Sequence, residues 1–307
     1  MGFSDKVKKE LGSKDKSQNS VNDEIIDTQI TNGQIRNFKY LYGLIHSGKK
    51  EIVLDSHIVL SDDEESEYKH GIKLDVDNLI IDGNGHSIDG INKTRIFNIN
   101  SKVTIKNLTL KSGYDIDGGA IYIQDGDVEI TNCQFQKNTA KRDGGAILNH
   151  GKLTIAETIF DENSAYKRSG AINNQPNSYV EITNCQFQKN TANKHGGAIL
   201  NWGKLTITET TFDENSTHQN SGGAINIQPN SDVEITNCQF QKNTAKQAGG
   251  AISNWGKLTI TETTFDENST QKISGGAINI QPNSDVEITN CQFQKNTAKE
   301  YGGAILN

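Results

Sequence analysis

The sequence has little of what marks a membrane protein or a nucleic-acid binder. No stretch approaches the roughly 20 apolar residues of a membrane-spanning helix, and only 33% of the 307 residues are hydrophobic. The net charge is −7, and no basic stripe is present. Because phosphate backbones are bound by clustered cations, we expect no nucleic-acid ligand, and we expect no membrane insertion by this chain.

Hydrophobic residues are also too few for a compact globule of this length, which would have to bury a large core. Yet Ile, Val, Leu and Phe recur at fixed spacing, which is not typical of a disordered chain. The three prolines exclude a proline-rich stalk. We therefore expect an elongated fold in which each short segment buries one stripe of side chains.

What the sequence does contain is an internal repeat. The nonapeptide NCQFQKNTA occurs four times unchanged, starting at Asn132, Asn184, Asn237 and Asn290. A Gly-Gly-Ala or Ser-Gly-Ala tripeptide recurs every 25 to 27 residues, with an FxxN motif between successive copies. Two versions of the unit alternate, so the true period is a double unit of 51 to 53 residues. Almost every position after Gly118 is repeated, which predicts that no unit is chemically unique.

Each unit of about 26 residues predicts three short strands separated by turns. Val128 and Ile130 alternate with polar residues, as do Cys133 and Phe135, and Ile121 begins a further strand. Alternation with a period of two places one face of a strand inward. Three strands and three turns per unit describe one coil of an all-β, parallel β-helix.

The four cysteines, one in each nonapeptide, are expected to point inward in one column, with threonines on the coils between them. Neighbouring coils lie about 4.8 Å apart, so cysteines on alternate coils are roughly 10 Å apart, too far for a disulfide or a shared metal ion. We predict buried structural thiols and neither a metal nor a cofactor. The cysteines are Cys133, Cys185, Cys238 and Cys291.

Other columns are expected to fix the register of the coils. The second residue after Phe alternates between Lys and Glu from Lys137 to Lys295. A similar column of Asp and Lys runs from Asp127 to Asp285, interrupted once by Tyr179. Opposite charges would then face each other on neighbouring coils. The FxxN asparagines suit left-handed turns and can stack as an amide ladder, and the Gly-Gly pairs suit a bend too tight for a Cβ atom. The asparagines are Asn138, Asn163, Asn190, Asn215, Asn243, Asn268 and Asn296.

The repeated GGA[IL] and FxxN motifs resemble the repeats of the chlamydial polymorphic outer-membrane proteins. The segments VDNLIIDGNGHSIDG and FNINSKVTIKNLTLKSG are similar to the opening coils of adhesin-like β-helix proteins of methanogenic archaea. The resemblance implies a right-handed, single-stranded parallel β-helix, a solenoid of the pectate-lyase-like type. It also implies display on a cell surface.

Four segments follow along the chain. Residues 1–30 are expected to be a flexible polar leader without the apolar core of a secretory signal. Residues 31–51 are expected to hold a short helix, ended near Gly48, that caps the first coil. Residues 52–117 would form irregular first coils, and residues 118–307 regular ones that stop part-way through a coil, which favours a fragment of a longer protein. The helical spacing is that of Ile35, Phe38, Leu41, Leu44 and Ile45.

Two tryptophans are the strongest candidates for ligand contact. Trp202 and Trp255 occupy the same position on alternate coils, with His150 at the equivalent earlier place. They fall in a turn, so we expect them to be partly exposed and about 10 Å apart. Exposed aromatic rings are common stacking platforms, which predicts glycan contact. The alternative is that each tryptophan packs on a proline of the intervening coil, such as Pro229.

Acidic residues offer weaker candidates. The run from Ser61 to Glu67 could hold calcium, but calcium needs six to eight converging oxygens, and contiguous acidic runs usually extend into water. Asp82 and Asp89, on either side of His86, are assigned to turns. Clustered, unrepeated acid and base groups would be needed for catalysis, and we expect no enzyme.

The pattern favours a non-enzymatic display or adhesion module of the cell surface, in which weak contacts sum along a β-helical rod. Its partners would be surface glycans or proteins of a host or neighbouring cell. One alternative is a carbohydrate-active β-helix lyase, hydrolase or epimerase with its site in residues 52–117 or beyond the C-terminus. Another is a non-exported fragment without independent function, since no signal peptide is evident and a cytoplasmic location stays open.

Overall fold

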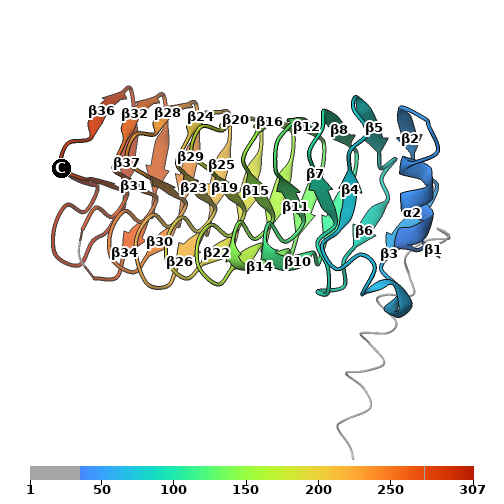
Figure 1. The fold of residues 1–307 in the computed structure, drawn as a ribbon. Helices are drawn as coiled ribbons and strands as arrows, with labels where there is room; N and C mark the ends of the chain where they lie inside the picture. The colour runs from blue at the N-terminus through green and yellow to red at the C-terminus, as the bar shows by residue number, and fades with distance from the viewer. Residues whose placement is uncertain (1–34, 273) are drawn as a thin grey trace, which may run out of the picture. The chain divides into compact units, whose positions relative to one another are not determined.

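The computed structural model describes residues 35–272 and 274–307, so the expected leader, residues 1–30, lies outside the described residues. These residues form an all-β parallel solenoid of about 11 turns with about 25 residues per turn. The strands stack coil upon coil in Figure 1, and every strand pairing among them is parallel. The predicted parallel β-helix is confirmed.

Two sheets, A and B, contain the strands in which buried and polar residues alternate along each coil. Sheet A contains, in spatial order, β1 (Ile35–Arg36), β3 (His57–Val59), β6 (Ser87–Asp89), β9 (Thr109–Lys111), β13 (Gln134–Gln136), β17 (Ile159–Asp161), β21 (Gln186–Gln188), β25 (Thr211–Asp213), β29 (Gln239–Gln241), β33 (Thr264–Asp266) and β37 (Gln292–Gln294). Sheet B contains β2 (Glu51–Val53), β5 (Leu79–Asp82), β8 (Val103–Lys106), β12 (Asp127–Thr131), β16 (Lys152–Ala156), β20 (Tyr179–Thr183), β24 (Lys204–Thr208), β28 (Asp232–Thr236), β32 (Lys257–Thr261) and β36 (Asp285–Thr289).

The strands after the Gly-Gly-Ala tripeptides form the third sheet. Sheet C contains β4 (Ile72–Leu74), β7 (Phe97–Ile99), β11 (Ile121–Ile123), β15 (Ile147–Asn149), β19 (Ile172–Asn174), β23 (Ile199–Asn201), β27 (Ile225–Ile227), β31 (Ile252–Asn254), β35 (Ile278–Ile280) and β38 (Ile305–Leu306).

The prediction of three strands per coil is incomplete, because a fourth sheet lies between sheets A and C. Its strands are mostly two residues long, too short to show a period in the sequence. Sheet D contains β10 (Tyr114–Asp117), β14 (Thr139–Asp143), β18 (Ser164–Ala165), β22 (Thr191–Ala192), β26 (Ser216–Thr217), β30 (Thr244–Ala245) and β34 (Ser269–Thr270).

The core is built from columns of identical side chains. The phenylalanines from Phe135 to Phe293 stack face to face, with ring centroids 4.7–4.9 Å apart and planes within 8° of parallel. This separation equals the spacing of hydrogen-bonded strands, so the backbone pairing itself sets the distance between rings. A separation of 4.7–4.9 Å also lies within the range of offset-stacked aromatic pairs, so the chain needs no further adjustment.

The FxxN asparagines form a fully buried amide ladder from Asn138 to Asn268. Asn190 Nδ2 donates to Asn215 Oδ1 on the next coil at 3.0 Å and to the Phe160 carbonyl on the preceding coil at 2.9 Å. Its Oδ1 accepts from the backbone and side-chain nitrogens of Asn163. Each amide therefore ties three coils together.

The left-handed conformation expected for these asparagines is wrong. It occurs instead at the residue just before each of them, where Lys137 and Glu162 both have φ of 53°. The asparagine side chain points inward to its ladder, and the charged residue before it takes the left-handed turn.

Three of the four cysteines are buried as predicted, whereas Cys291, near the C-terminal end of the stack, is only partly buried. Threonines alternate with the cysteines in this column. Thr158 Oγ1 accepts from the Cys133 backbone nitrogen at 3.2 Å, and Thr210 and Cys185 repeat this contact. Cys133 is 1% exposed, and Cys185 and Cys238 are each 2% exposed. Burial raises the pKa of Cys133 to about 12 and the pKa values of Cys185 and Cys238 to about 11.

The charge columns form fewer ion pairs than their sequence suggests. In the column from Lys137, Lys295 lies 3.0 Å from Glu267, and in the column from Asp127, Lys152–Asp127 and Lys257–Asp232 are 3.3 and 3.4 Å apart. These side chains are substantially exposed, so each pair contributes about 1 kcal/mol at most. Core packing therefore contributes more to register than surface charge does.

The predicted helix is present as α2 (Phe38–Ile45), which lies at the N-terminal end of the stack in Figure 1 and buries Phe38, Leu41 and Ile45. Ile35 is not part of it: it lies in β1 and is 68% exposed. Within residues 35–307 other than 273, no helix has the length and apolarity needed to cross a bilayer.

The acidic run is used to cap this helix. A short 3₁₀ turn, η1 (Asp62–Glu64), buries Glu64, whose carboxylate accepts from the backbone nitrogens of Phe38 at 3.1 Å and Lys39 at 2.8 Å. Asp62 and Glu65 instead face Lys93, each at 3.0 Å. Of the carboxylates considered for calcium, Glu64 therefore points to the helix, and Asp62 and Glu65 are paired with a lysine.

We predict that Asn190→Ala lowers the free energy of unfolding by roughly 2–4 kcal/mol, because a buried donor or acceptor left without a partner costs about 1–3 kcal/mol. The substitution removes the partners of Asn163 and of the Phe160 carbonyl. Urea unfolding followed by circular dichroism measures the change. The control is Gln186→Thr, an exposed position whose equivalent on the next coil is Thr211. Equal urea midpoints for the two variants would contradict the ladder's role.

We predict that stability falls as pH rises from about 9 to about 11. Thiols in the unfolded chain ionise near their ordinary pKa of 9.0, whereas the buried thiols hold their protons to about pH 11. The contribution of the buried thiols to the free energy of unfolding is therefore fully present below pH 9. It decreases above pH 9, because the unfolded state then binds fewer protons than the folded state. The urea midpoint is measured across this range.

The control for this prediction is a triple variant with Cys133→Thr, Cys185→Thr and Cys238→Thr, which extends the threonines of the intervening coils. It should show a shallower loss of stability above pH 9, because it removes the three thiols whose pKa values burial raises. The same slope in both proteins would show that the thiols do not contribute.

Candidate ligand-binding groove

Trp202 and Trp255 line one groove, with a volume of about 580 Å³, that we call the tryptophan groove. Trp255 is 45% exposed and Trp202 is half-buried. One side of the groove consists of turns between sheets C and B, and the other of connections between sheets D and C. The groove is lined by Lys167, Arg168, Lys194, His195, Leu200, Trp202, Gln228, Pro229 and Trp255.

The aromatic side of the groove follows from the alternation of two turn types. Trp202 and Gly203 alone separate β23 from β24, whereas residues 228–231, with sequence QPNS, separate β27 from β28. The backbone nitrogens of Trp202, Gln228 and Trp255 each bond the preceding coil at 2.9–3.0 Å. The column therefore reads Trp-Gln-Trp, and each tryptophan sits on a short turn beside a longer one. Pro229, the packing partner in the alternative interpretation, lies in the same groove.

The basic side of the groove comes from residues that do not repeat. Lys167 and Arg168 lie in the connection after β18, and Lys194 and His195 in the connection after β22. Each connection lies between an FxxN motif and a Gly-Gly or Ser-Gly pair, and its sequence changes from coil to coil: KRD, YKR, NKH. The prediction that no unit is chemically unique is therefore wrong. Three or four positions that vary within an otherwise strict repeat were therefore the feature of the sequence that could have indicated this side of the groove.

Two of the four basic side chains of the groove, Arg168 and His195, are engaged by other residues of the chain. Arg168 Nε donates to the buried Asp143 Oδ1 at 2.9 Å, and this hydrogen bond raises the arginine pKa. Asn220 Nδ2 lies 3.1 Å from His195 Nε2, which therefore accepts. Burial lowers the pKa of His195, and the nearby Arg168 and Lys194 lower it further. The free positive charges of the groove are those of Lys167 and Lys194.

His150 does not belong to this groove. It lies two coils before Trp202, where its ring meets the Tyr122 ring edge to face, with the ring centroids 5.6 Å apart. Arg95 lies over the same tyrosine at 5.1 Å and pairs with Asp115 at 2.9 Å, both side chains being 7% exposed. Arg95 also donates to the carbonyls of Asp117 and Gly118. These contacts hold a loop of the irregular coils in place.

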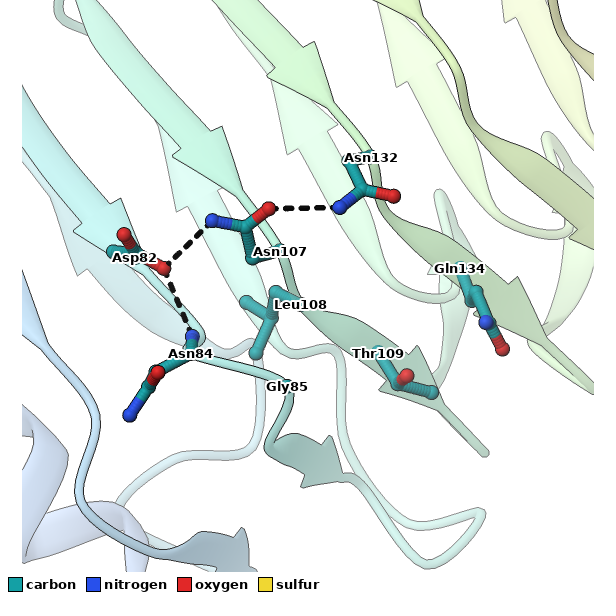
Figure 2. Close-up of a pocket in the computed structure, with 8 residues that line it drawn as sticks. All are labelled: Asp82, Asn84, Gly85, Asn107, Leu108, Thr109, Asn132 and Gln134. Atoms are coloured by element: carbon teal, nitrogen blue, oxygen red, sulfur yellow. Dashed lines mark hydrogen bonds between the residues drawn. The ribbon is translucent and has the colours of Figure 1, made fainter.

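A second concavity, of about 410 Å³, lies in the irregular coils and is shown in Figure 2. Asp82 is its only carboxylate, and Asp82 Oδ1 accepts from the Asn84 backbone at 2.9 Å and from Asn107 Nδ2 at 3.0 Å. Asn132 in turn donates to Asn107 at 2.8 Å. Asp82 also faces Lys106 at 3.4 Å. The carboxylate is therefore held in a turn, as Asp89 is by the Ile91 nitrogen.

The fold and the repeat identify the family. The chain belongs to the family described as the right handed beta helix region, whose sequence model matches residues 89–265 and 170–307. The handedness expected from the resemblance is therefore established. The closer likeness to methanogen and chlamydial proteins stays a prediction.

Two curated proteins show similarity to part of the chain. One is the metabotropic glutamate receptor-like protein R of Dictyostelium discoideum, 32% identical over 131 residues, which cover 42% of this chain and 8% of that protein. The other is the probable autotransporter YfaL of Escherichia coli K12, 31% identical over 136 residues, which cover 42% of this chain and 10% of that protein. The matches thus span a tenth or less of these relatives.

Proposed function

We propose that this chain is a non-enzymatic adhesion module of the cell surface that binds extended glycans in the tryptophan groove. The observation that carries the proposal is the placement of Trp202 and Trp255 in one groove, at the same position on alternate coils. Two coil spacings give a separation of about 10 Å, so one extended chain of sugars can contact both rings.

The chemistry of the groove suits sugars. Indole faces pack against the C–H faces of sugar rings and bury apolar area without requiring a charged partner. Gln228, between the tryptophans in the column, offers an amide that can donate to and accept from hydroxyl groups. Because these side chains are fixed on hydrogen-bonded turns, little conformational entropy is lost on binding.

A surface location is supported by the relatives, one named a probable autotransporter and the other a receptor-like protein. Adhesion through a repeated scaffold needs only modest affinity at each groove, because several copies on one cell bind together by avidity.

The non-enzymatic part of the proposal is supported by the concavity in residues 52–117 and just beyond. Its single carboxylate is engaged by Asn84, Asn107 and Lys106, and its other lining residues are amides, a threonine, a leucine and a glycine. Acid–base catalysis of glycan cleavage uses a second titratable group, which this lining does not supply.

We predict that Trp202→Ala and Trp255→Ala each weaken polysaccharide binding at least about tenfold, because tryptophan anchors at interfaces commonly contribute 2 kcal/mol or more. Binding to xylan, β-glucan, chitin oligosaccharides and polygalacturonate is measured by calorimetry. The control is Tyr301→Ala, which removes an aromatic ring that is 63% exposed outside the groove. Failure of the native chain to bind any of these, or unchanged affinity in the tryptophan variants, would contradict the proposal.

We predict that the chain is modified on intact cells by a membrane-impermeant amine-reactive biotin reagent, since lysines such as Lys137, Lys167 and Lys194 are exposed. Biotinylated peptides are identified by mass spectrometry, and a cytosolic enzyme serves as the control for cell integrity. Labelling of the repeats only after lysis would exclude a surface location.

A further inference from the structure

The tryptophan groove carries a charge opposite to that of the chain. The whole sequence has a net charge of −7, with 38 acidic and 31 basic residues. The groove, in contrast, is lined by two lysines, an arginine and a histidine, and by no acidic residue. Such a local reversal concentrates anions at the groove.

The two lysines hold the charge that a ligand can use. Both are exposed, and neither forms an ion pair with a residue in the described ranges. They lie on neighbouring coils, because the Lys194 backbone nitrogen donates to the Lys167 carbonyl at 2.7 Å. The third cation, Arg168, is neutralised by Asp143 of the preceding coil. The lysines thus form a pair of point charges along one edge of the groove.

Their spacing relates them to the aromatic side. Trp202 and Trp255 are two coils apart, and the two lysines are one coil apart, in the direction in which the coils stack. Lys194 lies on the coil of Trp202, and Lys167 lies on the coil before it. A linear polymer on both tryptophans therefore passes Lys194 and reaches Lys167 when it extends one coil beyond Trp202. Leu200, fully buried in β23, forms the floor between the two sides.

We propose that the ligand of the tryptophan groove is an acidic glycan, whose sugar rings pack on Trp202 and Trp255 and whose carboxylate or sulfate groups lie against Lys167 and Lys194. This inference rests on the proposed glycan-binding function and adds the class of glycan. It gives a role to the two exposed lysines in the connections beside Trp202, since both Lys167 and Lys194 line the groove.

The test compares two matched pairs of polymers with the full chain: polygalacturonate against its methyl ester, and dextran sulfate against dextran. We expect at least one acidic polymer to bind about tenfold or more tightly than its neutral partner at low salt, with the preference declining as salt screens the charges. The pair that shows the preference distinguishes carboxylate from sulfate recognition.

The variant Lys167→Gln/Lys194→Gln should lose this preference and retain the weaker binding of the neutral partner. The matched control, Lys189→Gln/Lys242→Gln, removes two exposed charges from the turns between sheets A and D, outside the groove lining, and it should behave as the native chain does.

Three outcomes would overturn the inference. If acidic and neutral polymers bound equally and Trp255→Ala abolished both, the glycan-binding function would stand and the preference for acidic glycans would be refuted. Equal competition by poly-glutamate or single-stranded DNA would identify a general polyanion surface. Binding of no polymer by the native chain would contradict both this inference and the proposed function.

Discussion

The parallel hydrogen bonding between coils is the constraint on which the rest of this molecule depends. It fixes a spacing near 4.8 Å, and every inward side chain must repeat at that spacing. Phenylalanine rings meet this requirement by stacking at 4.7–4.9 Å, and asparagine amides meet it by bonding from coil to coil at 2.9–3.0 Å. The glycine pairs follow from the same limit: a Cβ on Gly197 would lie 2.0 Å from the Gly223 carbonyl of the next coil.

This constraint divides the chain into positions that cannot vary and positions that can. An inward residue touches the coils on both sides, so replacing Asn190 leaves several polar groups of the preceding coil without their partners. The connections between sheets D and C point outward and contact fewer neighbours. They consequently hold the unrepeated residues, among them Lys167 and Lys194. The scaffold and the candidate site thus occupy different parts of each coil.

The same division explains what could be predicted from sequence. The alternation of Val128, Ile130, Cys133 and Phe135 reports directly on burial, so the coil, its repeat and its core were predictable. The left-handed turn was assigned to Asn138 from residue preference, whereas the structure places it at Lys137 because the ladder needs the amide inside. The capping of α2 by Glu64 and the approach of Lys194 to the tryptophans depend on contacts between distant segments, which no local pattern contains.

The alternation of two coil types has a consequence for the groove itself. Trp202 and Trp255 lie on the short turns of two alternate coils, and the longer QPNS turn lies between these two short turns. If every coil carried the Trp-Gly turn, indoles about 4.8 Å apart would stack on one another as the phenylalanines do, and their faces would be hidden. Placing Gln228 between them leaves about twice that distance, so each ring keeps a face open. A double repeat is therefore the smallest period in this fold that gives a regular core and separated aromatic contacts.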